Sequence, residues 1–90
     1  MSMEELTAKY IASAEKVLAT LKRNPLPADI TEESLNEILS YTMDYLKDAK
    51  YYKAQGKLET SLTSIAYCEG LLDALRLIGA VKFEWPTKKP

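Results

Sequence analysis

The fold is decided by residues 41–79, YTMDYLKDAKYYKAQGKLETSLTSIAYCEGLLDALRLIG. On both sides of Gly56, apolar residues recur at steps of three, four or seven, the spacing that forms one buried stripe on a helix. They are Leu35, Ile38, Leu39, Leu46, Ala49 and Tyr52 before the glycine, and Leu58, Leu62, Ile65, Leu72 and Leu75 after it. Glycine readily takes the left-handed conformation that closes a helix, so we expect two antiparallel helices to meet at Gly56.

A third amphipathic pattern precedes this hairpin and has its own stop signal. Asn24-Pro25-Leu26-Pro27 ends the first helix, because proline disfavours the helical conformation in the residue before it. Thr31 is then a good N-cap for the second helix, since two glutamates follow it in the first turn. The predicted helices cover residues 3–23, 31–55 and 57–79.

Three amphipathic helices joined by short connections can bury all their stripes against one another. We therefore predict an all-α fold, an antiparallel three-helix bundle that forms a single domain over residues 1–90 and needs no strand. The tail, residues 80–90, is expected to be irregular. It holds the single Phe and the single Trp, Phe83 and Trp85, which we expect to fold back onto the bundle; docking on a partner is the alternative.

The composition excludes several classes of function. Twelve basic and 13 acidic residues give a net charge of −1, so we expect no binding to nucleic acid or to a membrane. The sequence has no histidine, which removes the commonest general base and metal ligand. The single cysteine, Cys68, fits a reducing cytoplasm. We expect a cytoplasmic protein that is not an enzyme and holds no cofactor.

Charged residues interrupt the apolar stripe of the third helix. Glu69, Asp73 and Arg76 fall within one sector of that helix, at about 100° per residue. Like charges four residues apart destabilise a helix unless a cation lies between them, and Arg76 can be that cation. Counting from Gly56 places Asp44 at a similar level, so Asp44, Glu69 and Asp73 could converge. The cluster is interpreted as a salt-bridge network or, alternatively, as a site for a small ligand or divalent cation.

Gly70 interrupts the same helix. A glycine inside a helix costs about 1 kcal/mol relative to alanine, which indicates a packing or functional reason for it. Ala66, Gly70 and Ala74 are spaced four apart and form a stripe of small residues. Such a stripe allows close approach of another helix or ring, so we expect tight packing inside the bundle or across a dimer; a ligand cleft is the alternative.

Residues 44–80 read DYLKDAKYYKAQGKLETSLTSIAYCEGLLDALRLIGA, and in this run Tyr52, Gly56 and Tyr67 precede the Glu69-Gly70 pair. The run resembles the archaeal domain of unknown function 357 family. Members of that family show a tyrosine-rich helix, a glycine turn and an AEGLLDA-like helix that ends in glycine. Cys68 replaces the alanine expected before Glu69. The resemblance implies a small helical domain, found alone or beside nucleotidyltransferase-like domains, and implies no established activity or catalytic residue.

The sequence therefore predicts a non-catalytic module for protein interaction or self-association. Its candidate interface consists of Tyr67, Gly70, Ala74, Phe83 and Trp85, and its partner is another protein or a second copy of the chain. The alternative is a protein that binds a small ligand or divalent cation through Asp44, Glu69, Asp73 and Arg76 and is tied to nucleotide metabolism.

Overall fold

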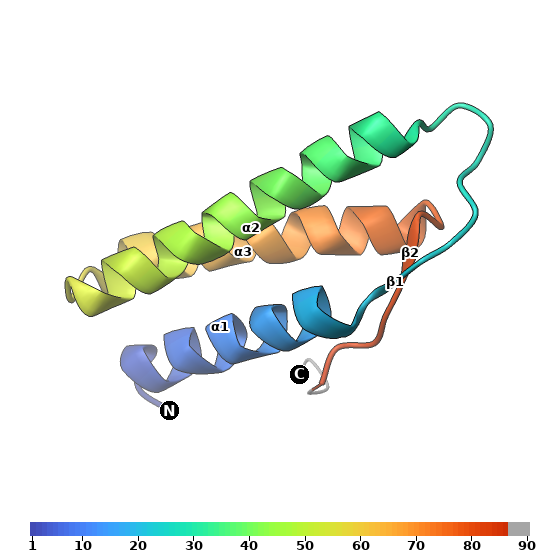
Figure 1. Ribbon diagram of the computed structural model, residues 1–90. Coiled ribbons are helices and arrows are strands. Elements are labelled where there is room, and N and C mark those ends of the chain that lie inside the picture. The colour runs from blue at the N-terminus through green and yellow to red at the C-terminus, as the bar shows by residue number, and fades with distance from the viewer. Residues whose placement is uncertain (87–90) are drawn as a thin grey trace.

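The computed structural model describes residues 1–86 and contains three helices (Figure 1): α1 (Met3–Thr20), α2 (Glu32–Ala54) and α3 (Leu58–Leu77). Consecutive helices run in opposite directions, so α1 and α3 point the same way. This arrangement confirms the predicted all-α, antiparallel three-helix bundle. The bounds of α2 and α3 lie within two residues of those expected, whereas α1 ends three residues earlier than expected.

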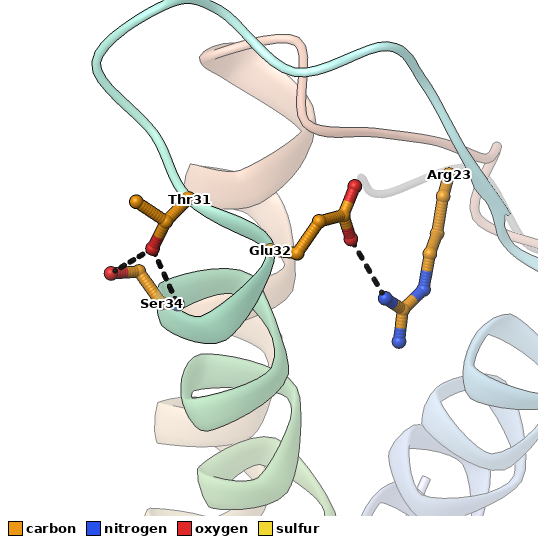
Figure 2. A network of polar contacts seen from close by, with 4 residues as sticks. All are labelled: Arg23, Thr31, Glu32 and Ser34. Atoms are coloured by element: carbon orange, nitrogen blue, oxygen red, sulfur yellow. Dashed lines mark hydrogen bonds and ion pairs between the residues drawn. The ribbon is translucent and has the colours of Figure 1, made fainter.

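Side-chain caps set the starts of α1 and α2. The Ser2 hydroxyl accepts the Glu5 amide proton at 3.1 Å, while the Glu5 carboxylate accepts the Ser2 amide proton at 3.2 Å. The pKa of Glu5 is lowered because its carboxylate accepts this bond from the Ser2 amide and a second one, at 2.9 Å, from the Ser2 hydroxyl. At α2 the predicted N-cap is confirmed, since the Thr31 hydroxyl accepts the Ser34 amide proton at 3.0 Å (Figure 2).

The same backbone device ends α2 and α3. Gly56 and Gly79 have positive φ angles of 75° and 81°. At each helix end the glycine amide and the amide after it donate to carbonyls of the last turn, which is the Schellman arrangement. The left-handed residue expected at Gly56 is therefore confirmed. At Gly79 the chain reverses and returns along the bundle.

The core lies between the helices and extends to the two residues after Gly79. α2 and α3 form the main interface, and the Ser61 hydroxyl of α3 donates to the Ala49 carbonyl of α2 inside it. On the surface, Lys50 of α2 pairs with Glu15 of α1 at 2.7 Å. Among residues 1–86, twelve hydrophobic residues are buried: Ile11, Ala14, Val17, Leu35, Leu39, Ala49, Ile65, Cys68, Leu72, Leu75, Ala80 and Val81.

The structure departs from expectation at the first helix end and in the tail. Lys22–Arg23 form a strand, β1, and Val81–Lys82 form a second, β2, which pairs with it antiparallel. The predictions that the first helix continues through Arg23 and that the tail is wholly irregular were therefore wrong at these residues. The reason is that Val81 is buried, so its backbone needs a partner, and the extended chain after Leu21 supplies one. Residues 87–90 of the expected tail lie outside the described part of the chain.

Burial makes the core thiol unreactive, which can be tested directly. Desolvation raises the pKa of Cys68 from 9.0 to about 12, and the neighbouring Glu69 charge adds to this. We expect native Cys68 to react at least about 100-fold more slowly with a thiol reagent at pH 8 than in urea, because only the thiolate is nucleophilic. Since the folded pKa exceeds the unfolded value, the thiol contributes stability below pH 9 that is lost as the pH rises towards 12. Equal reaction rates in buffer and in urea would contradict the buried position.

Candidate functional site

The charged cluster of α3 meets the C-terminal tail. Asp73 Oδ1 accepts a hydrogen bond from Trp85 Nε1 at 2.8 Å and lies 3.4 Å from Arg76 Nη2. The indole bond is short and partly buried, whereas the Arg76 contact is long and its side chain is 42% exposed. A charge-assisted bond of the first kind contributes more than an exposed ion pair. Asp73 therefore joins α3 to the C-terminal tail through the Trp85 indole.

One ring contact within the tail and one contact between the tail and α3 accompany this hydrogen bond. The rings of Phe83 and Trp85 meet edge to face, with centroids 5.1 Å apart and an interplanar angle of 83°. The Arg76 guanidinium carbon lies 5.6 Å from the centroid of the Phe83 ring, within the range of a cation–π contact. Both aromatic residues also pack against the core. Up to Trp85 the tail folds back onto the bundle, which is the first of the two arrangements considered for Phe83 and Trp85.

The remaining two members of the predicted cluster are not joined to Asp73 in a cation site. Asp44 is exposed on α2 and Glu69 is half-buried on α3. Within residues 1–86, no three acidic or cysteine side chains come close enough together to hold a metal ion, so the expected convergence of Asp44, Glu69 and Asp73 is absent. Tyr45, one residue and about 100° further round the helix than Asp44, contacts Tyr67 of α3.

Tyr45 of α2 packs on Tyr67 of α3, with ring centroids 4.4 Å apart and planes inclined by 35°. Tyr67 nevertheless keeps 55% of its surface exposed. The pair therefore forms one edge of an exposed area that continues along α3.

Gly70 does not pack tightly inside the bundle, contrary to one of the expectations for it. A Cβ built on Gly70 meets nothing within 4 Å, and Ala66 and Ala74 are exposed on the same side. Two large apolar residues that the sequence analysis did not single out, Leu77 and Ile78, are 77% and 50% exposed. We call Ala66, Tyr67, Gly70, Ala74, Leu77 and Ile78 the outer face of α3.

The outer face could have been found from the sequence. At about 100° per residue, its six positions lie within roughly 120° of the helix circumference. The buried stripe of the same helix, which includes Ile65, Leu72 and Leu75, points elsewhere. The pattern that indicates it is a second apolar sector on the same helix. When only one buried stripe is expected on a helix, the residues of the second sector are not distinguished from those of the first.

The fold and the site define a small helical bundle whose tail is docked on its own polar cluster. The sequence model of the family described as "Protein of unknown function (DUF357)" matches residues 9–81, so the chain belongs to this family. No curated protein and no solved structure matches the chain. None of the helices formed by residues 1–86 is both long and apolar enough to cross a bilayer.

Removing the Asp73 carboxylate should release the tail. We expect Asp73→Ala to lower the free energy of unfolding by about 1 kcal/mol, because the Trp85 indole loses a charged acceptor. Trp85 is the single tryptophan, so a red shift of its emission reports the release. Asp73→Asn keeps an acceptor oxygen and serves as the control, with a smaller effect on both readings. An unchanged emission spectrum in Asp73→Ala would contradict the docked position of the tail.

The open surroundings of Gly70 predict that alanine stabilises the monomer. Gly70→Ala should raise its free energy of unfolding by about 0.5–1 kcal/mol, since the helix gains propensity and no atom lies in the way. Gly56→Ala is the matched control, because Gly56 has a left-handed backbone and alanine there costs about 1–2 kcal/mol. Urea unfolding at a concentration where the protein is monomeric measures both. A loss of stability in Gly70→Ala would show that the position is packed.

Proposed function

We propose that this protein is a non-catalytic interaction module of the cytoplasm that binds through the outer face of α3, and that the partner is a second copy of the chain. The observation that carries this proposal is the open position of Gly70. A glycine within a helix costs about 1 kcal/mol relative to alanine. Among the described residues, however, no atom lies within 4 Å of the place that a Cβ on Gly70 would take. A helix of another molecule, approaching closely, would use that room.

The apolar character of α3 on two sides supports the same proposal. α3 is less amphipathic than α1 or α2, because apolar residues occupy its outer face as well as its core side. Helices that are apolar around much of their circumference are normally covered on both sides. Leu77 and Tyr67 are large and more than half exposed, and exposed apolar surface of this kind is typical of interaction sites.

The position of Gly70 favours an interface between identical chains. Gly70 lies near the middle of α3, with Ala66 and Ala74 at equal steps on either side of it. An antiparallel crossing of two α3 helices at Gly70 brings Ala66 of each copy opposite Ala74 of the other. Such a face is self-complementary under two-fold symmetry, as the interface of a symmetric dimer must be.

The alternative function, ligand or cation binding through Asp44, Glu69, Asp73 and Arg76, has less support from the geometry. Asp73 bonds to the Trp85 indole, and Arg76 contacts both Asp73 and the Phe83 ring. A ligand at Asp73 would have to displace the Trp85 indole. The tail residues Phe83 and Trp85 are likewise removed from the proposed interface, because they pack against the chain's own core.

Sedimentation equilibrium tests the proposal by comparing the wild-type chain with Gly70→Leu. We expect a concentration-dependent dimer for the wild type and a monomer for Gly70→Leu, because a leucine at the crossing point keeps the two helices apart. The variant should remain folded, since a side chain at Gly70 enters open space.

Ala19→Leu is the matched control, because it adds a leucine at an exposed position of α1, away from α3. It should dimerise like the wild type. A wild-type chain that stays monomeric at millimolar concentration would overturn self-association, and a dimer that Gly70→Leu leaves intact would overturn the choice of interface.

A further inference from the structure

A solvent-open hollow of ≈ 640 Å³ lies where the β1–β2 ribbon meets the C-terminal end of α3. Three cations line it, Lys22 of β1, Lys82 of β2 and Arg76 of α3, against one carboxylate, Glu84. The lining therefore has an excess of two positive charges in a chain whose net charge is −1. Charge of this sign in a concave surface attracts anions.

The strand register places the two lysines together. Lys22 and Lys82 are direct partners across the antiparallel ladder, so their side chains leave the same face of the ribbon. Like charges directly opposite each other destabilise a strand pair. An anion held between the two ammonium groups would convert this repulsion into attraction.

The side chains of Asn24 and Arg76, which also line the hollow, have more N–H donors than they use in their bonds to a backbone carbonyl and a carboxylate. The Asn24 side-chain amide uses one of its two N–H groups on the Gly79 carbonyl. The Arg76 guanidinium uses one nitrogen on Asp73 and has five N–H donors in all. Together with the two ammonium groups, these donors come from three separate segments of the chain and border one space.

We propose that this hollow binds a phosphate group, carried by a small organic molecule or present as the free ion. A phosphate dianion matches the excess of two positive charges, and Arg and Lys are its usual protein donors. The volume exceeds that of a phosphate ion, and the half-buried Phe83 ring gives the hollow an apolar wall for an attached organic group. This site is independent of the outer face of α3, so either proposal can fail alone.

An amide NMR titration with phenyl phosphate tests the proposal, in a phosphate-free buffer at constant ionic strength. We expect saturable shifts at Lys22, Asn24 and Lys82, with a Kd on the order of millimolar for so open a site. A parallel titration with inorganic phosphate separates the two sources: tighter binding of phenyl phosphate assigns the site to a phosphate ester, and equal binding assigns it to the free ion. Shifts that rise linearly without saturation overturn the proposal.

The double variant Lys22→Gln/Lys82→Gln should bind at least roughly tenfold more weakly, since it lacks two charged donors. Lys16→Gln/Lys47→Gln removes the same charge from exposed positions on α1 and α2 and should bind like the wild type. Without phosphate, the first variant should melt at a higher temperature than the wild type, because the opposed charges are gone. Equal weakening in both double variants would show that only net charge matters and would overturn the site.

Discussion

Asn24 joins the segment that follows α1 to the segment that follows α3 by two hydrogen bonds, and the position of the C-terminal tail depends on this connection. Its backbone amide donates to the Ala80 carbonyl and its side-chain amide donates to the Gly79 carbonyl, both at 3.1 Å. The first bond extends the pairing of β1 with β2, and the second fixes the turn that follows α3. One residue of the linker after α1 thus helps to fix where the tail leaves α3, although 55 residues of sequence separate the two segments.

That exit direction decides which surfaces of α3 are covered. From β2 the tail runs past Arg76, and Trp85 reaches Asp73. The sector of α3 that carries these charged residues is therefore occupied by the chain itself. The neighbouring sector, the outer face, receives no such cover, and its leucine and tyrosine remain more than half exposed. The same turn places Lys82 opposite Lys22 and so forms the basic hollow.

The sequence predicted the helices well because local signals agreed with packing. Thr31 as N-cap, Gly56 as the left-handed helix end and the apolar stripes each pointed to the same bundle. It did not predict β1 and β2, because a two-residue strand has no periodicity and depends on a partner far along the chain. For the same reason the Trp85–Asp73 bond was not foreseen, although both residues had been singled out separately. Counting along a hairpin suggested a level for Asp44, but it does not establish which way a side chain points.

When two chains associate through the outer face of α3, the charge of the two basic hollows bears on how the helices cross. Arg76 is six residues from Gly70, which is about 9 Å along the axis of a helix. In an antiparallel crossing at Gly70, the two basic hollows move apart along the axis by about twice that distance, beyond the Debye length of about 8 Å at physiological salt. In a parallel crossing the hollows would lie at the same level, and their excess positive charges would repel each other. Electrostatics therefore favours the antiparallel arrangement, which is also the one that matches Ala66 to Ala74 across the two-fold axis.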